Sequence, residues 1–194
     1  MTSDTSTIAA TLRRQLSGES GRRVYGVVDG ARCVDLAFEA KIHFGVQIRS
    51  LFLPELQARL WNVSPYLVPI DLAGDYLENW ARRWGESAGV LLVSAAEEEP
   101  LYQHLRKIFV VQDEQQQEFF FRFYDPRVLR NFLPTCSPAQ LDEFFGPVEA
   151  IAVESDAGEA LLRFTKQNGK LMEERLNLSS DAGIRQHATR LPHE

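Results

Sequence analysis

The chain has 194 residues, 44% of them hydrophobic, and a formal net charge of −6. A chain of this length buries about 70% of its unfolded surface on folding, so we predict a single domain over residues 1–194. The acidic balance excludes a surface built to neutralise phosphates, and nucleic acid is therefore not an expected partner.

The sequence contains no segment typical of export or of membrane insertion. Residues 2–20 lack the apolar stretch of a signal peptide, and nothing approaches the ~20 apolar residues of a membrane span. Cys33 and Cys136 have no Cys or His at metal-ligand spacing, and the chain has no glycine-rich phosphate loop. We expect buried thiols and a cytoplasmic protein, with no metal, no cofactor and no membrane partner.

Predicted strands and helices alternate through the first half of the chain. Ile8, Leu12 and Leu16 recur every four residues, which indicates a weak amphipathic helix. Strands are predicted at residues 24–28, 48–52, 66–70 and 89–94, and helices at 33–41, 54–61 and 72–84. This alternation is typical of parallel pairing in an α/β layer structure.

Three of these elements have side chains of further interest. Asp29 and Gly30 form the turn that ends the first strand. The helix that follows is expected to point Val34, Leu36 and Phe38 partly inward. The helix over residues 72–84 has one stripe of large side chains, and such a stripe is most often core. The stripe consists of Leu72, Tyr76, Trp80 and Trp84, widened by Leu77.

The second half of the chain adds antiparallel strands. The acidic residues 97–99 begin a helix, and residues 108–111 and 119–124 are predicted to form a hairpin attached to the parallel part. Ser137 and Gln140 fit a capping box, which opens a helix that stops at Gly146. Residues 150–153, 160–164 and 171–176 are predicted as a small β meander. The complete prediction is an α/β fold with a mixed sheet that has a largely parallel core.

The stretch over residues 121–134 is the most informative part of the chain. Aromatic side chains lie on both faces of its predicted strand, so that strand is expected to be buried. Asp125 and Pro126 then predict a helix start, because the carboxylate accepts free N–H groups and proline has no donor to lose. The helix points Val128, Leu129 and Phe132 inward and leaves Arg127 and Arg130 on its outer side.

Phe121–Leu129 reads F-R-F-Y-D-P-R-V-L, a long and specific pattern. Further matching segments lie at residues 25–31, 64–68, 84–85, 89–94 and 144–148. Together they closely resemble the adaptor (chaperone) family of bacterial type VI secretion over roughly residues 22–150. The resemblance implies a noncatalytic protein that binds a cognate toxic effector and helps to load it onto the VgrG spike. Nothing after Val148 resembles the family.

Residues 85–89 match the G-x-S-x-G pattern of a hydrolase, with Asp125 and His187 following in the order of a catalytic triad. A nucleophile elbow needs a strand before Ser87 and a helix after it, whereas the predicted order here is the reverse. A plain helix-to-strand connection is the favoured interpretation, and a serine hydrolase is kept as an alternative. A general interaction domain unrelated to secretion is a third hypothesis.

Charged and aromatic residues near the predicted helix start have two interpretations. In the first, Arg122 and Arg127 form an internal ion-pair network with Asp125 or another acid, because buried charges are normally paired. In the second, Arg122, Tyr124, Arg127 and Arg130 line a partner-binding groove, where Arg and Tyr are enriched. The surface near Trp80 and Trp84 is the alternative place for that groove.

Overall fold

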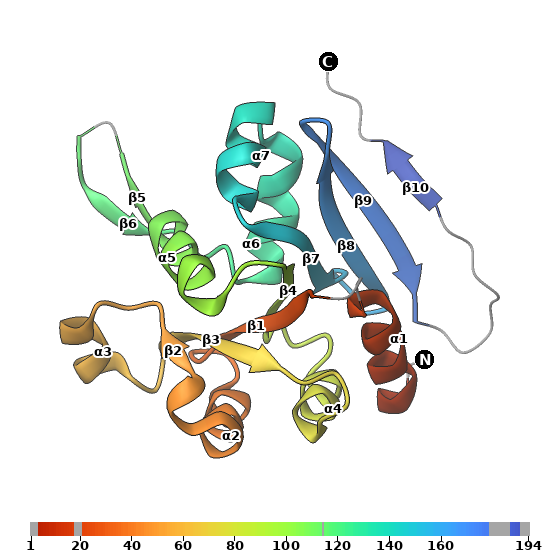
Figure 1. Ribbon diagram of the computed structural model, residues 1–194, viewed down its shortest axis with the longest axis horizontal. Coiled ribbons are helices and arrows are strands. Elements are labelled where there is room, and N and C mark those ends of the chain that lie inside the picture. The colour runs from red at the N-terminus through yellow and green to blue at the C-terminus, as the bar shows by residue number, and fades with distance from the viewer. Residues whose placement is uncertain (1–3, 18–20, 114, 179–186, 191–194) are drawn as a thin grey trace.

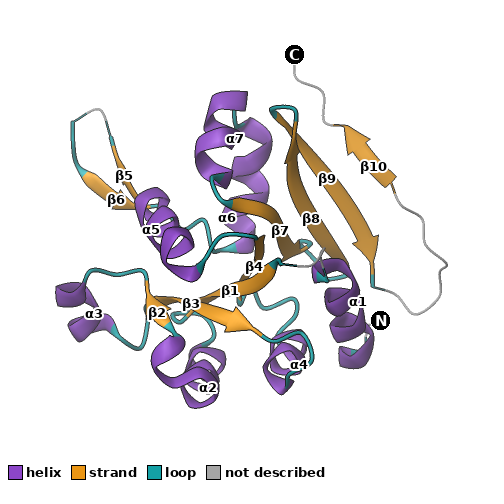
Figure 2. Ribbon diagram, viewed as in Figure 1, coloured by secondary structure: helices purple, strands orange, loops and turns teal. Residues whose placement is uncertain are grey.

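The computed structural model describes residues 4–17, 21–113, 115–178 and 187–190, the last four as backbone only. One β-sheet with helices on both faces forms its centre (Figures 1 and 2). The strands are β1 (Arg23–Asp29), β2 (Arg49–Ser50), β3 (Pro65–Ile70), β4 (Gly89–Ser94), β7 (Val148–Glu154), β8 (Ala160–Gln167), β9 (Lys170–Asn177) and β10 (His187–Arg190). Their order across the sheet is β10-β9-β8-β7-β4-β1-β3-β2.

The helices divide between the two faces of the sheet and create two hydrophobic cores. One core includes the apolar sides of α1 (Thr5–Leu16), α2 (Val34–Phe44) and α4 (Asp75–Arg82). The other includes those of α5 (Glu98–Phe109), α6 (Pro126–Phe132) and α7 (Pro138–Phe145). The seven-residue helix α3 (Pro54–Leu60) buries none of its residues. Short 3₁₀ turns follow α2 at Gly45–Gln47 and α6 at Leu133–Thr135.

Every strand pairing in the central sheet is antiparallel, so the predicted parallel core is wrong. β3 and β4 both run antiparallel to β1, which lies between them. Helix α4 therefore connects two strands that point the same way but exchange no hydrogen bonds. The alternation of strands and helices is compatible with parallel directions, but it does not determine which strands become neighbours.

Two elements of the first half are shorter than predicted for local reasons. Strand β2 contains only Arg49 and Ser50, because the Ser50 hydroxyl accepts the N–H of Phe52 (3.0 Å) and the chain bends there. Helix α4 begins at Asp75 instead of residue 72, because Asp71 accepts the N–H of Ala73 (2.9 Å) in a turn. The predicted helix at residues 8–16 and the strands at 24–28, 66–70 and 89–94 are confirmed.

The predicted hairpin exists, but it is separate from the central sheet. β5 (Val110–Gln112) and β6 (Glu118–Phe120) pair only with each other, and they extend away from the sheet in Figure 1. Phe119 and Phe120 are each 51% exposed, whereas Phe123 and Tyr124 are buried beyond the end of β6. The expectation of a buried strand over residues 119–124 is wrong, because β6 belongs to a hairpin apart from the central sheet and its phenylalanines stay half exposed.

The C-terminal predictions are confirmed. Ser137 and Gln140 form the capping box of α7, and β7, β8 and β9 form a meander. This meander extends the central sheet, since β7 pairs with β4 and β10 pairs with β9. None of the helices within the described ranges combines the length and the hydrophobicity that a membrane-spanning segment requires.

Candidate functional site

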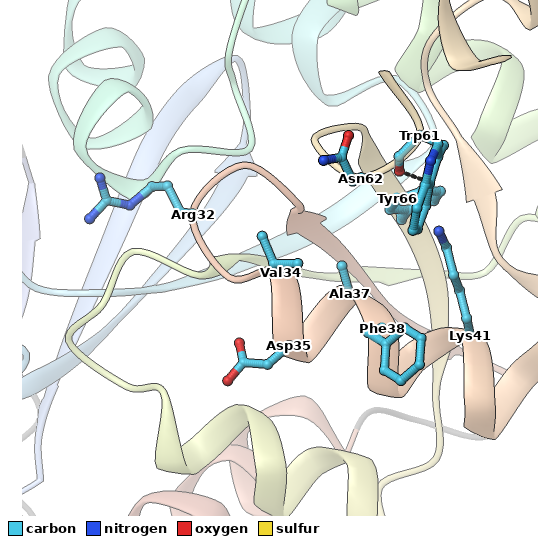
Figure 3. A pocket seen from close by; sticks show the side chains of 9 residues that line it. All are labelled: Arg32, Val34, Asp35, Ala37, Phe38, Lys41, Trp61, Asn62 and Tyr66. Carbon is cyan, nitrogen blue, oxygen red and sulfur yellow. Dashed lines mark hydrogen bonds between the residues drawn. The ribbon is translucent and has the colours of Figure 1, made fainter. Parts of the chain in front are cut away.

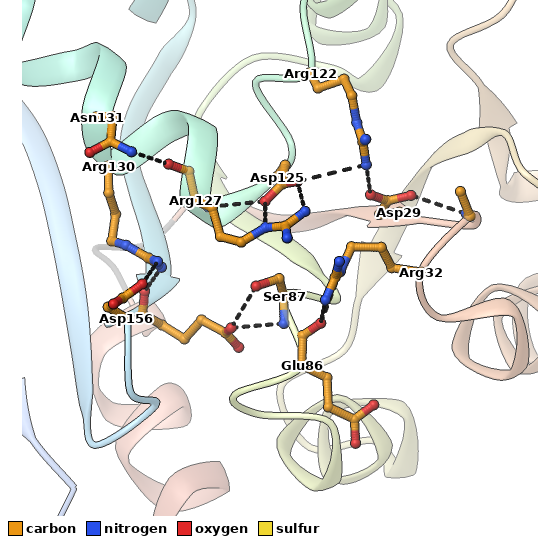
Figure 4. Close-up of polar contacts among 12 residues, drawn as sticks. Asp29, Arg32, Glu86, Ser87, Arg122, Asp125, Arg127, Arg130, Asn131 and Asp156 are labelled. Atoms are coloured by element: carbon orange, nitrogen blue, oxygen red, sulfur yellow. Dashed lines mark hydrogen bonds and ion pairs between the residues drawn. The ribbon is translucent and has the colours of Figure 1, made fainter.

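Buried acidic residues meet several arginines at one end of the sheet, in what we call the charged cluster (Figure 4). The cluster consists of Asp29, Arg122, Asp125, Arg127, Arg130 and Glu154. Asp29 ends β1 and Glu154 ends β7, and the start of β4 lies between these two strand ends. The antiparallel topology therefore brings together acids that are far apart in the sequence.

Asp29 joins the first strand to the segment before α6. Its side chain is 1% exposed and accepts a hydrogen bond from Arg122 Nη2 (2.6 Å). Its other oxygen accepts the N–H of Ala31 (3.0 Å), which closes the turn that the sequence predicted at Asp29 and Gly30. A Cβ atom on Gly30 would lie 2.5 Å from the carbonyl oxygen of Ser64, so only glycine fits there without a shift.

Asp125 caps α6 as predicted, with Pro126 as the first helical residue. Its carboxylate accepts the N–H and Nε of Arg127 (both 3.0 Å) and Arg127 Nη2 (2.6 Å), and Arg122 lies 3.7 Å away. Burial alone raises the pKa of the Asp125 carboxyl, but the hydrogen bonds and charge of Arg127 outweigh it and hold the pKa below its ordinary value. The internal ion-pair network is thus present in the structure.

Glu154 is a member of the charged cluster that the sequence analysis missed. It is 5% exposed and accepts the N–H groups of Gly85 (2.6 Å) and Ser87 (2.8 Å). Burial raises the pKa of its carboxyl, although the hydrogen bonds from Gly85 and Ser87 act in the opposite direction. The sequence signal for this residue was a charged side chain at the end of an apolar strand. Its partners Gly85 and Ser87 are distant in the sequence, so the contact could not be predicted.

Arg130 does not lie on an exposed outer side of α6, which corrects the prediction. Its side chain is 14% exposed, donates to the carbonyl oxygen of Glu154 (2.7 Å) and pairs with Asp156 (3.0 Å). Arg127, which is 49% exposed, is held by Asp125. The two arginines therefore differ, because only Arg127 keeps a large part of its guanidinium side chain in solvent.

The structure suggests that Arg130 contributes to stability. We expect Arg130→Ala to lower the free energy of unfolding by about 1–2 kcal/mol, because a largely buried, charge-assisted hydrogen bond is lost. Chemical denaturation monitored by circular dichroism measures this loss. Arg175→Ala is the matched control, since the exposed pair of Arg175 with Glu159 should contribute little. Equal effects of the two substitutions would contradict the assignment.

The remaining predicted partner-binding residues are mostly inside the protein. Tyr124 is 5% exposed, and burial raises the pKa of its phenol to about 12. Trp80 is buried against Gly26, where an added Cβ would lie 2.5 Å from the indole ring. Trp84 is half-buried against the same core. These aromatic side chains pack against the core, whereas Arg122 and Arg127 each keep nearly half of their side chain exposed.

Ser87 lies in the connection between α4 and β4, which is the order that the sequence predicted. The residue is 6% exposed, has a φ of 57°, and donates its hydroxyl to Glu154 (3.2 Å). Asp125 is engaged by Arg127, and the side chain of His187 lies outside the described part of the chain. The described side chains place no histidine beside the Ser87 hydroxyl.

Helix α2 presents an exposed apolar row that includes Val34 and Phe38, two residues predicted to point partly inward. Val34 and Phe38 are 53% and 55% exposed, and Ile42 continues the row one turn further. The inward side of α2 is formed instead by Leu36, Ala37 and Ala40. The sequence indicated this surface, because α2 has two rows of apolar residues at helical spacing. A helix needs only one such row to pack against a core, so the second row can be exposed.

Val34 and Phe38 of this row line a groove of about 530 Å³ between α2 and the turn after α3 (Figure 3). We call it the α2–α3 groove. Val34, Phe38, Trp61 and Tyr66 supply its apolar walls. Lys41 points into the groove from α2, with its ammonium nitrogen 4.1 Å from the centre of the Trp61 ring and 4.7 Å from that of Tyr66.

A second exposed apolar surface lies on the hairpin. Val111, Phe119 and Phe120 are all more than one-third exposed there. Phe120 stacks on Phe109 with 4.8 Å between ring centres, which ties the hairpin to α5. A pocket of about 460 Å³ beneath the hairpin is lined by Phe121, Phe132 and other residues.

These observations define an α/β protein built on an antiparallel sheet, with a self-paired charged cluster and two exposed apolar surfaces. No group of three His, Cys, Asp or Glu residues in the described part of the chain is placed to hold a metal ion. The chain belongs to the family described as "Domain of unknown function (DUF4123)", which matches residues 24–143. Comparisons with curated proteins and with solved structures found no match.

Proposed function

We propose that this protein is a noncatalytic cytoplasmic adaptor that binds a toxic effector of a bacterial type VI secretion system and helps to load it onto the VgrG spike. The secretion role is supported by the resemblance over roughly residues 22–150, most specifically at Phe121–Leu129. Membership of the DUF4123 family over residues 24–143 is compatible with it.

The observation that carries the binding role is the exposure of large apolar side chains in two groups. Contiguous exposed apolar surface is typical of protein-interaction sites. The exposed residues are Val34, Phe38, Ile42, Leu53, Leu60 and Trp61 on α2, α3 and their flanks, and Val111, Phe119 and Phe120 on the hairpin. The charged cluster, in contrast, already satisfies its acids within the chain.

Arg122 and Arg127 remain candidate contacts for a partner. Each pairs with a buried aspartate but leaves 44% or 49% of its side chain exposed. Guanidinium groups have five N–H donors, so the outer donors are free to contact a partner carboxylate while the inner ones hold the cluster. Of the four residues predicted to line a partner-binding groove, Arg122 and Arg127 remain candidates, and we assign structural roles to Arg130 and Tyr124.

Co-purification of the full chain from its native host tests the proposed function. Protein carrying an affinity tag at either terminus should retain one effector and a spike component, identified by mass spectrometry. A standard interface buries about 1,600 Å², which is enough for isolation when its central contacts are strong. Recovery of no secretion-system protein with either tag from a secreting host would overturn the proposal.

The hydrolase alternative depends on Ser87 and is tested separately. Ser87→Ala should leave the protein folded and effector loading unchanged, with a stability loss of about 1 kcal/mol or less from the weak hydroxyl bond to Glu154. Thermal unfolding and an esterase assay of both proteins provide the measurements. A wild-type esterase activity that disappears in Ser87→Ala would favour the hydrolase, since losing a true nucleophile costs orders of magnitude in rate.

A further inference from the structure

We propose that the α2–α3 groove binds an amphipathic helix of a partner protein, and that this helix carries a carboxylate that pairs with Lys41. The proposal rests on the proposed function in one respect, because it takes the partner to be the effector. The groove, the apolar row of α2 and the position of Lys41 carry the argument.

The apolar row has the dimensions of a helix-docking surface. Val34, Phe38 and Ile42 are spaced by four residues, so they extend over about 12 Å along one side of α2 at 1.5 Å per residue. Trp61, 53% exposed, stands on the other side of the groove. A ridge of apolar side chains beside a groove is the surface on which a second helix packs.

Lys41 supplies the charge that selects the occupant. Its ammonium group lies over the rings of Trp61 and Tyr66, and burial there lowers the pKa of Lys41. Within the described part of the chain no carboxylate lies within ion-pair distance of it. Cation–π contacts hold the ammonium in place but leave its N–H donors without an anion.

The nearby charged groups have partners of their own. Asp35 also lines the groove, and its carboxylate pairs with Arg83 at the end of α4. Arg32, at one end of the groove, donates two hydrogen bonds of 3.1 Å to the carbonyl oxygen of Glu86. A carboxylate brought in by a partner would therefore pair with Lys41 without displacing an existing ion pair.

The chemistry of the groove favours a helix over an added strand. Strand addition requires a free row of backbone N–H and C=O groups, whereas side chains of α2, of Trp61 and of Tyr66 form these walls (Figure 3). The apolar stripe of such a helix would pack against the walls of the groove, and a carboxylate at the edge of the stripe would pair with Lys41. An acidic amphipathic helix is accordingly the occupant that we assign.

Peptide binding to the full-length protein tests the groove directly. The probes are three amphipathic helical peptides of about 18 residues that are identical except for Glu, Gln or Lys at the edge of the apolar stripe. Fluorescence of the exposed Trp61 and calorimetry measure binding. The Glu peptide should bind roughly tenfold more tightly than the Gln peptide, and the Lys peptide should bind most weakly.

Variants of the protein separate the charge contact from the apolar contact. Lys41→Met should abolish the preference for the Glu peptide over the Gln peptide, and Lys41→Glu should make the Lys peptide the tightest binder. Phe38→Asp should abolish binding, whereas Gln167→Asp, which adds the same charge at the exposed end of β8, should not. Circular dichroism confirms folding. Equal affinities of the three peptides for the wild type, or unchanged binding by Phe38→Asp, would overturn the proposal.

Effector capture in the host distinguishes this inference from the proposed function. Loss of effector with Phe38→Asp but not with Gln167→Asp supports the groove. Equal capture by wild type and Phe38→Asp overturns the groove and leaves the adaptor function standing. Peptide selectivity without capture of any secretion-system protein supports the groove and overturns the adaptor function. A wild-type dimer that Phe38→Asp converts to a monomer assigns the groove to a second copy and overturns the proposal.

Discussion

Glu154→Ala is expected to lower the free energy of unfolding by about 3 kcal/mol, the largest effect predicted for one side chain outside the aromatic core. The substitution leaves the N–H groups of Gly85 and Ser87 without their acceptor. Because Ser87 is buried in a left-handed conformation, the connection between α4 and β4 has little freedom to find another. Urea denaturation at neutral pH measures the effect.

The control for this prediction is Glu149→Ala on the same strand. Glu149 is a partly exposed member of an ion pair with Arg22, so its loss should cost about 1 kcal/mol or less. Similar losses for the two substitutions would show that the turn does not depend on the Glu154 carboxylate.

The pH dependence of the same variants tests the pKa shift of Glu154. Its folded pKa is raised above the ordinary value of 4.5, so the folded state binds the proton more strongly than the unfolded state. The contribution of this group to stability therefore falls as the pH rises from 4.5 through the folded pKa. Glu154→Gln has no such titration, and the stability of the wild type should decline relative to it over that range.

Asp125→Ala is expected to lower the free energy of unfolding by about 2 kcal/mol. Loss of the helix cap accounts for about 1 kcal/mol, and the rest comes from the ion pairs with Arg127 and Arg122. Solvent limits the second contribution, because both arginines are about half exposed. Asp142→Ala in α7 is the matched control, since Asp142 lies exposed in a pair with Lys166.

The pH dependence of Asp125 has the opposite sign to that of Glu154. Its folded pKa lies below the ordinary value of 3.8, so the unfolded state binds the proton more strongly. Its stabilising contribution is complete above pH 3.8 and is lost as the pH falls through the folded pKa. The free energy of unfolding should therefore fall less steeply with decreasing pH in Asp125→Asn than in the wild type. An identical acid transition in both proteins would contradict the role of this carboxylate.

Local chemistry was sufficient to predict most of the elements. The caps at Asp125 and Ser137 were readable because each involves atoms only two or three residues apart. The strands β1, β3 and β4 were readable as short apolar runs bounded by turns. Half of the charged cluster could be predicted from the sequence, since Arg122, Asp125 and Arg127 lie within six consecutive residues.

The burial of several residues was predicted wrongly because it depends on contacts with segments that are distant in the sequence. Phe119 and Phe120 have the alternation of a buried strand, but both are about half exposed because the hairpin lies apart from the central sheet. Val34 and Phe38 have helical spacing, but spacing does not decide which of two apolar rows faces the sheet.

The sequence by itself determined most of the helices and strands and the helix caps at Asp125 and Ser137, because these depend on short-range patterns. Only the tertiary structure decided that β1 separates β3 from β4, and that Glu154 holds the connection at Ser87. It also decided that Lys41 lies between Trp61 and Tyr66 in an open groove. The physical reason is that strand order and side-chain exposure depend on which distant segments pack together, and local propensity contains no term for that choice.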